Sequence, residues 1–518
     1  MKMLVSYTLA LIMVMSVCGI AGAEEFSYPM DGQTVTFSAG DPGTNNAEWL
    51  DEQYGWWNQM EQRTGITIVC TGGKFSNLNT EEFLLLLADD DLPDIIWGPD
   101  LFKSFVTNPA MLIEDGYILR LNDYADSLPN YMGYLDKHPE LAASITLEDG
   151  TLFCFPRYDE EPPVGQGLMI RGDWLQELNL EVPNTPEAMK EVLKAFRDNK
   201  GATTPISFQP NYLWEGSLSA GWDNFGMRFY QEDGVVKFGV LEKGFREFVT
   251  EMGEWYAEGL IDPDMPSASK QSVEAAMSNG SAGIVGNQIS KIENMYNYNA
   301  DNPTYSVVGF TISAEGDEIP STGVCDQRVD LSVSFLISAD CENLEAALRW
   351  CDYQYSEDGI LLNSFGTQGY SWDYDEQGNV VAAGILLDDT IPEVNTNKVN
   401  AVSKGTNWGG VLKSHFFGLM EPALNASKAW SATTAMDHML PYLTYTVEES
   451  ETYSQAYADC TTLIKESVIN FIMGVKPLEE YDAFIEQLHA FGIDACIEVQ
   501  QAAYDRYLAN YAKLTAVQ

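Results

Sequence analysis

The amino-acid sequence predicts an α/β protein that folds as two large lobes. Short apolar runs bounded by glycine and proline alternate with helical patterns, which indicates a mostly parallel sheet covered by helices. The chain has 518 residues, more than a single hydrophobic core of about 250–300 residues accommodates. Neither a repeat nor a low-complexity linker separates two halves, so we expect the chain to cross between the lobes more than once.

The first elements follow one another closely along the chain. Alternating or continuous apolar residues predict the strands, and apolar residues at helical spacing predict the helices. In order, we expect a strand over 34–37, a turn-rich loop over 40–46, a helix over 49–63, a strand over 66–69, a helix over 81–88 and a strand over 94–97.

Helices farther along the chain show their ends as well as their faces. Thr185 and Pro186 supply an N-cap and a first-turn proline, and apolar residues follow at i, i+3, i+4 and i+7. The same spacing begins at Leu344 and at Tyr481, and Gly492 is expected to end the second of these helices. From about 431 to 514 the pattern is almost entirely helical.

The first 23 residues are typical of an export signal. Lys2 is followed by a largely apolar stretch over 4–17, and Ala21-Gly22-Ala23 forms a cleavage pattern of small residues. Two alternatives stay open: an uncleaved anchor, because the stretch approaches bilayer length, and lipidation at Cys18, which Val17 disfavours. We expect cleavage after Ala23 and an extracellular or cell-surface protein.

The charge excludes two classes of partner. The net charge is −49, from 77 acidic and 28 basic residues. Nucleic acids and anionic membranes require clustered lysine and arginine, so we expect no nucleic-acid partner. Solubility at a crowded cell surface is the simpler interpretation of the acidity, and we expect a monomer.

The cysteines and histidines predict neither a disulfide framework nor a metal site. Seven cysteines remain after the signal, an odd and scattered set without a CxxC pair. The four histidines are far apart in sequence. We therefore expect no metal and no cofactor, and most thiols to be buried as small apolar groups.

Eight segments, taken in order, resemble one known family. They are 93–97 (PDIIW), 115–121 (DGYILRL), 150–156 (GTLFCFP), 168–175 (LMIRGDWL), 255–264 (WYAEGLIDPD), 281–284 (SAGI), 366–370 (GTQGY), and 471–474 (FIMG) with the helix that ends near Tyr507. Each is a weak match alone, but the eight run in order from one end of the mature chain nearly to the other, and together they are a strong match. In these segments the sequence is similar to the extracellular solute-binding proteins of ABC importers, in particular the larger lipoprotein-type branch that serves oligosaccharides.

The resemblance implies a type II periplasmic-binding-protein fold. Such a fold has two α/β lobes, a hinge of crossing strands, a cleft that closes on ligand and here a helical C-terminal region. By this analogy the signal peptide is 1–23, the first lobe comprises 24–155 and 329–406, and the second lobe comprises 156–328 and 407–518.

A carbohydrate site would need aromatic rings and amide or acidic side chains. Rings stack on the C–H faces of a sugar, and polar side chains bind its hydroxyls. Such residues lie past the carboxyl ends of strands or where the chain crosses between lobes. We therefore select candidates at those places.

The candidates nearest the first lobe are Trp97, Asp41, Asn45, Arg157 and Tyr158. Trp97 follows a strand and is either a stacking platform or a core residue. Asp41 and Asn45 are either hydroxyl partners or turn residues. Arg157 closes over ligand or, as the simpler alternative, pairs with a neighbouring acid.

The second lobe offers an aromatic cluster and two amides. Tyr212, Trp214 and Trp222 have no helical period, which favours a cleft over a core. Asn287 and Gln288 follow a strand and either donate into the cleft or form a solvent turn. Trp372 and Trp408, in glycine-rich loops, complete the set, with core packing as the alternative for both.

These observations predict the substrate-binding subunit of an ABC transporter, which captures a carbohydrate, a neutral oligosaccharide, and delivers it to a membrane permease. The alternatives are a peptide receptor of the same transporter class and a secreted glycoside hydrolase with paired carboxylates. The sequence has no GxSxG, HExxH or P-loop motif. We expect a binding protein without enzymatic activity.

Overall fold

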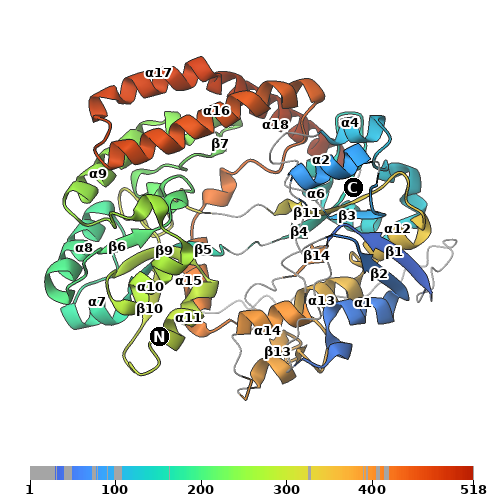
Figure 1. Cartoon of the computed structure of the whole chain (residues 1–518), viewed down its shortest axis with the longest axis horizontal. Coiled ribbons are helices and arrows are strands. Elements are labelled where there is room, and N and C mark those ends of the chain that lie inside the picture. Colours follow the sequence, from blue (N-terminus) through green and yellow to red (C-terminus); the bar gives the residue numbers. More distant parts are fainter. Residues whose placement is uncertain are drawn as a thin grey trace, which may run out of the picture.

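The computed structural model describes residues 30, 32–39, 50–72, 78, 80–89, 91–97, 108–160, 162, 164–324, 328–388, 390–391, 395–403, 409–412 and 419–516. These residues form two α/β lobes, and three C-terminal helices lie across one side of both (Figure 1). The predicted two-lobed α/β architecture with a helical C-terminal region is confirmed.

The first lobe is built on a six-stranded sheet in the order β14-β4-β11-β3-β1-β2. Its strands are β1 (Gln33–Phe37), β2 (Ile66–Cys70), β3 (Ile95–Trp97), β4 (Phe155–Asp159), β11 (Val329–Ile337) and β14 (Gly410–Val411). β11 runs antiparallel to both β3 and β4. The other five strands all run in one direction, so the sheet is mostly parallel as predicted. β11 is its one antiparallel strand, because it enters from the second lobe at the edge where β4 leaves.

Helices cover the first sheet and form its core. They are α1 (Trp56–Thr64), α2 (Thr80–Asp89), α4 (Pro109–Glu114), α5 (Pro129–Lys137), α6 (Pro139–Ile145), α12 (Leu344–Tyr353), α13 (Glu357–Phe365) and α14 (Asn395–Val402). Val35 and Phe37 of β1 are fully buried, and α12 packs on β1 and β11. A small hairpin of β12 (Trp372–Tyr374) and β13 (Val380–Ala382) adds a separate apolar cluster.

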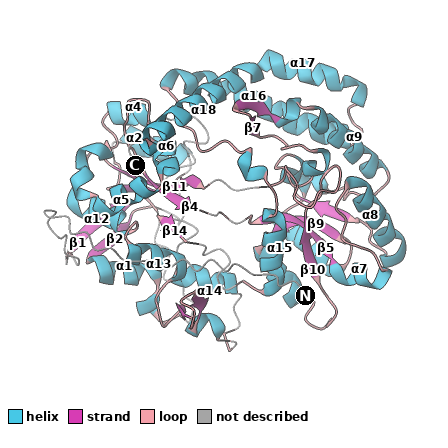
Figure 2. Ribbon diagram, turned by 180° about the vertical axis from the view of Figure 1, so that it is seen from behind, coloured by secondary structure: helices cyan, strands magenta, loops and turns pink. Residues whose placement is uncertain are grey.

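The second lobe has a four-stranded sheet in the order β10-β5-β9-β6. Its strands are β5 (Gln166–Arg171), β6 (Ile206–Phe208), β9 (Ile284–Gln288) and β10 (Val307–Phe310). Leu168 and Ile170 face one core, whereas Met169 between them faces the other, as the period of two in a strand requires. Helices therefore cover both faces of this sheet (Figure 2).

The helices of the second lobe are α7 (Gly172–Leu178), α8 (Pro186–Lys200), α9 (Lys243–Ala257), α10 (Lys270–Asn279), α11 (Ser290–Tyr298) and α15 (Glu421–Ser431), with a hairpin of β7 (Phe229–Glu232) and β8 (Val235–Phe238). α8 begins as predicted, because the Thr185 hydroxyl accepts a hydrogen bond from the amide of Ala188 and Pro186 occupies the first turn. It ends at Gly201, which has a φ of +71°. Glycine adopts this left-handed conformation readily because it has no Cβ to clash with the backbone.

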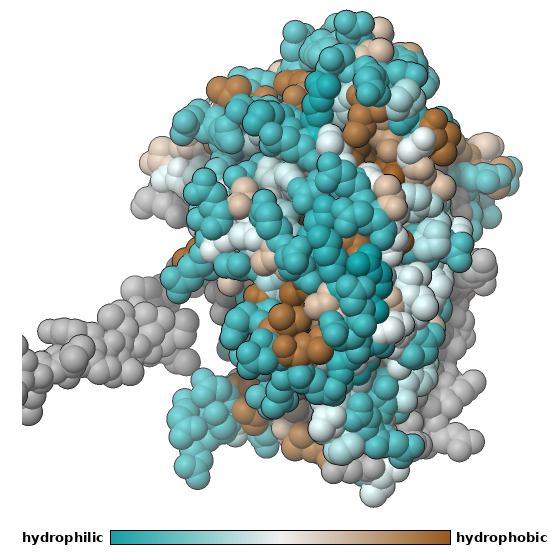
Figure 3. All heavy atoms as spheres, turned by 90° about the vertical axis from the view of Figure 1, so that its left-hand side faces the viewer, coloured by the Kyte–Doolittle hydropathy of each residue, from teal (hydrophilic) through white to brown (hydrophobic). Residues whose placement is uncertain are grey.

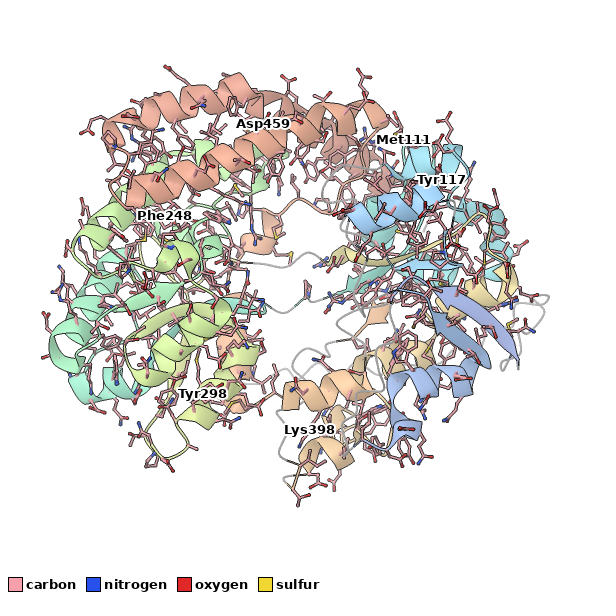
Figure 4. All side chains as sticks on the ribbon, viewed as in Figure 1. Met111, Tyr117, Phe248, Tyr298, Lys398 and Asp459 are labelled. Carbon is pink, nitrogen blue, oxygen red and sulfur yellow. The ribbon has the colours of Figure 1, made fainter. Side chains whose placement is uncertain are left out.

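The C-terminal helices join the lobes. They are α16 (Val447–Ile472), α17 (Tyr481–Phe491) and α18 (Ile493–Thr515). α16 packs against α9, and α18 packs against both α16 and α6 of the first lobe. Figure 4 labels Phe248 on α9 below Asp459 on α16. Asn108, which caps α4, donates a hydrogen bond from Nδ2 to the Tyr445 carbonyl at 2.9 Å. This bond connects the first lobe to the segment just before α16.

The predicted lobe boundaries stay predictions, but sheet membership bears on them. Residues 156–159 belong to β4 in the first sheet, although the prediction placed them in the second lobe. β14 at 410–411 also pairs with β4. The connections therefore begin a few residues later than expected.

The outer face of the second lobe is mostly hydrophilic, with scattered apolar groups (Figure 3). This agrees with the excess of acidic residues in the sequence. Among the described residues, no helix is long and apolar enough to cross a membrane. The segment 1–29, which contains the expected signal and Cys18, lies outside the described residues.

Candidate functional site

Between the described elements, the chain passes from lobe to lobe after β4, after β10 and after β14. The connections from β4 to β5 and from β10 to β11 join the two sheets at one edge of each. In the first sheet, β4 and β14 end and β11 begins at this edge. In the second sheet, β5 begins beside the end of β9, and β6 and β10 end there too. Ligands of open α/β sheets bind outside the carboxyl ends of strands, so this edge is where we place the candidate site.

A buried carboxylate lies at this edge of the second lobe. Glu215 Oε2 accepts a hydrogen bond from Gln166 Nε2 at 3.1 Å, and its Oε1 accepts one from the amide of Ser217 at 3.1 Å. Burial raises the pKa of Glu215 to about 7, although these bonds and the charge of Arg228 oppose the rise. Gln166 is the first residue of β5, so the bond from Glu215 fixes the side-chain amide of Gln166 at the point where the chain enters the second lobe.

The predicted residues Tyr212, Asn287 and Gln288 come to the same edge. Tyr212 lies against β9, where a Cβ at Gly286 would be 2.5 Å from its ring. Among the described residues its buried hydroxyl has no hydrogen-bond partner. Asn287 is fully buried and donates from Nδ2 to the Lys270 carbonyl at 3.3 Å, whereas Gln288 is half-buried at the end of β9.

Trp214 and Trp222 pack toward the helices of the second lobe. Trp222 donates from Nε1 to Glu251 Oε2 at 3.2 Å and contacts the ring of Phe248, both on α9. The Trp214 ring lies 5.8 Å from Nζ of Lys465 on α16. Neither contact lies at the edge that holds Glu215. The three aromatic residues of the predicted cluster therefore do not pack together: Tyr212 contacts β9, whereas Trp214 and Trp222 contact helices.

Arg157 and Tyr158 lie in β4, beside the first connection. Arg157 Nη2 is 3.4 Å from Asp159 Oδ2, the ion pair given above as the simpler role. The Tyr158 hydroxyl donates to Glu140, and the bonds from Tyr158 and His138 lower the pKa of Glu140 to about 2 although its burial opposes this. Both residues thus have partners within the first lobe.

Trp97 and Trp372 lie in apolar clusters of the first lobe. Trp97 is 5% exposed and stacks on Phe37, with ring centroids 6.1 Å apart. Trp372 is buried against Phe365 and donates from Nε1 to the Gly366 carbonyl at 2.9 Å. The remaining candidates, Asp41, Asn45 and Trp408, lie outside the described residues.

Within the described part of the chain, no group of histidine, cysteine and acidic side chains is arranged to hold a metal ion. In the acidic turn between β12 and β13, the carboxylate oxygens of Asp375 accept hydrogen bonds from within the turn. Asp375 Oδ1 accepts from the amides of Gln377 and Asn379, and its Oδ2 accepts from Asn379 Nδ2.

Sequence reasoning missed Gln166, Glu215 and Ser217. A signal was present for Glu215, because it lies between a tryptophan and a glycine in the loop already singled out for its aromatic residues. Gln166 follows the Pro-Pro-Val-Gly segment that precedes β5. Nothing in the spacing, however, indicated that the two side chains meet across 49 positions.

Comparison with known proteins finds relatives that match most or part of the chain. The fructooligosaccharide ABC transporter substrate-binding protein FusA of Streptococcus pneumoniae serotype 4 is 24% identical over 491 residues, 87% of each chain. The polygalacturonan/rhamnogalacturonan-binding protein YtcQ of Bacillus subtilis is 27% identical over 214 residues, 40% of this chain and 41% of that protein.

Solved structures share the fold. Alginate-binding protein AlgQ2 superposes with a TM-score of 0.72 at 21% identity, over 92% of this chain and 98% of that one. FusA in complex with kestose gives a TM-score of 0.72 at 20% identity, over 92% and 100% of the two chains. Both are two-lobed periplasmic-binding proteins, which confirms the predicted fold class.

A family model also matches this chain over residues 46–360, more than half of its length. The match includes most of both sheets and the edge that holds Gln166 and Glu215. The chain therefore belongs to the family of bacterial extracellular solute-binding proteins.

Proposed function

We propose that this protein is the substrate-binding subunit of an ABC importer and that it captures an oligosaccharide between its lobes. The observation that carries the proposal is the likeness, over 87% of both chains, to a fructooligosaccharide ABC transporter substrate-binding protein. Two further relatives are described as binding polygalacturonan or rhamnogalacturonan and alginate. The relatives agree on carbohydrate and differ in its charge.

The arrangement of the edges supports capture by closure. Gln166, Gln288 and Tyr212 lie at the edge of the second sheet that meets the connections, and Tyr158 lies at the matching edge of the first. A ligand that contacts both edges only when the lobes approach stabilises the closed form, which shifts the population toward it. The closed form is then the state that a membrane permease recognises, and no chemical step is needed.

The cellular setting follows from the same proposal. A solute-binding protein works outside the membrane, so the N-terminal segment serves export, with cleavage after Ala23 or attachment of a lipid at Cys18. We propose that the exported chain acts as a monomer, because one chain already contributes both edges of the site.

Tryptophan fluorescence of the purified mature protein tests the proposal. The protein is titrated with kestose, nystose, trigalacturonate, other oligosaccharides and short peptides. A saturable change with one oligosaccharide class, with the sugar recovered uncut by mass spectrometry, is the expected result. Binding of peptides alone refutes the carbohydrate cargo, and recovery of cleaved sugar refutes a purely binding role.

A further inference from the structure

A small cavity lies at the edge of the second lobe where two of the connections meet the sheet. Gln166 follows the first connection, Thr311 begins the second, and Gly323 lies farther along the second. All three line the cavity, together with Ser217. A group bound here therefore touches both connections at once.

Two of the polar side chains that line the cavity are held in place by Glu215. Ser217 is 8% exposed, and its hydroxyl lies beside the Glu215 carboxylate, where it helps to lower the pKa of that group against the effect of burial. The amide of Gln166 is held by Glu215, which accepts a hydrogen bond from its Nε2 at 3.1 Å, and its Oε1 is an acceptor for a hydroxyl group. A hydroxyl that donates to a carboxylate still has an oxygen that accepts, so a hydroxyl group of an occupant can donate to Ser217.

Apart from Thr311, the rest of the lining is apolar, and the space is small. Phe310, Val324 and Trp430 form its walls, and the interior holds about one water-sized group. The cavity is partly open to solvent. It cannot hold a whole sugar ring in this conformation, but it fits a polar tip on a short carbon arm.

The charges around the cavity oppose an anionic occupant. No lysine or arginine is among the described residues that line it, so a carboxylate inside would be desolvated without a counter-ion. The Glu215 carboxylate directly behind Gln166 adds repulsion whenever it is ionised, and the charge of Arg228 offsets part of this repulsion. Neutral hydroxyl groups meet no such cost.

From this geometry we infer that the cavity receives a neutral hydroxyl or hydroxymethyl group of the bound carbohydrate and rejects a carboxylate at that position. The inference rests on the proposed function and adds to it the class of cargo. A hexose unit with a hydroxymethyl arm fits the cavity, whereas the corresponding uronate unit, whose arm ends in a carboxylate, does not.

The test compares neutral and uronate ligands on the same variants by isothermal titration calorimetry. The probes are kestose, nystose, a panel of neutral hexose trisaccharides, trigalacturonate and a mannuronate trisaccharide. Ser217→Ala removes the hydroxyl and Ser217→Val fills the cavity. Ser278→Ala is the matched control, because Ser278 of α10 likewise has a buried hydroxyl but does not line the cavity.

We expect the unaltered protein to bind a neutral probe and neither uronate. Ser217→Ala should weaken that binding by about 3–10-fold, the loss of one hydrogen bond. Ser217→Val should weaken it further, and Ser278→Ala should leave it unchanged. Thermal melts of each variant separate a loss of binding from a loss of folding.

Two results overturn the inference while the proposed function stands: uronate probes that bind as tightly as neutral ones, or a folded Ser217→Val protein that binds the neutral probe with unchanged affinity. A protein that binds none of the glycans overturns the proposed function itself, and the inference with it. The three results are therefore distinguishable.

Discussion

Arg171 and Asp173 form a two-point ion pair in the interior of the second lobe. Arg171 Nε is 2.8 Å from Asp173 Oδ1, and its Nη2 is 2.6 Å from Oδ2. The guanidinium also lies over the rings of Trp174 at 4.4 Å and Tyr305 at 4.6 Å. The pair joins the end of β5 to the first turn of α7, so both partners are satisfied where strand and helix meet.

Replacing one partner of this pair should destabilise the protein strongly. Arg171→Met leaves the Asp173 carboxylate buried without a counter-charge, which costs about 3–5 kcal/mol. We expect the melting temperature in differential scanning calorimetry to fall by several degrees. Lys243→Met is the control, because Lys243 pairs with Glu247 at 86% side-chain exposure and such pairs contribute about 0–1 kcal/mol. Equal effects of the two substitutions would contradict the prediction.

The carboxyl group of Glu215 should make stability depend on pH. Its pKa is raised from 4.5 to about 7, so between these values the native state holds a proton that the unfolded chain has released. Stability therefore falls as the pH rises through this window, by an amount on the order of 3 kcal/mol, and is constant above it.

Glu215→Gln removes this titration, so we expect the variant to melt higher than the unaltered protein at about pH 8 and the gap to close toward about pH 5. Melting curves over that range measure the gap. Glu247→Gln, at an exposed acid of α9, serves as the control. A gap that stays constant with pH would show that Glu215 does not titrate in this window.

Two glycine-to-alanine substitutions should act in opposite directions. At Gly167 in β5, a Cβ would be 2.6 Å from the indole of Trp430, so Gly167→Ala should destabilise by about 1–3 kcal/mol. At Gly133 in the middle of α5, a Cβ meets nothing within 4 Å, so Gly133→Ala should stabilise by about 0.5–1 kcal/mol. Chemical denaturation of both variants checks the signs, and a stable Gly167→Ala protein would require Trp430 to move.

Trp97 should matter to folding more than to binding. It is buried beside Phe37, so Trp97→Ala leaves a cavity and should cost about 3–5 kcal/mol. Trp97→Phe keeps most of the packing and should retain affinity for any oligosaccharide the protein binds. Calorimetric titration of Trp97→Phe measures the affinity. A large loss of affinity without a change in melting temperature would contradict the prediction and show that Trp97 contacts the ligand.

The sequence predicted those parts of the fold that depend on local pattern. The α8 helix followed from Thr185, Pro186 and four apolar residues, and Gly492 ends α17 with a φ of +99° as expected. The direction of β11 could not be predicted from the sequence. Its antiparallel pairing with β3 and β4 depends on the chain entering the sheet from the second lobe, which is not a local property.

The candidate site was predicted less completely, for a physical reason. Local pattern placed Asn287 and Gln288 near the end of a strand, although both lie within β9 and not in a turn after it as expected. Whether an aromatic residue faces ligand or core depends on distant neighbours: Trp222 contacts α9, and Trp97 contacts β1. The bond between Gln166 and Glu215 likewise joins segments whose proximity only the folded chain creates.

The dependence of α6 on α18 has a consequence for the order of folding. Neither lobe is formed by a continuous stretch of chain. The first sheet includes β14, and the hydrophobic core of the second lobe includes residues of α16, α17 and α18. Contacts of such long sequence separation form slowly. The newly made chain therefore remains incomplete until its last residues are available. Losing residues 493–516 should leave the second lobe with an exposed core and free α6 of the first lobe from its support.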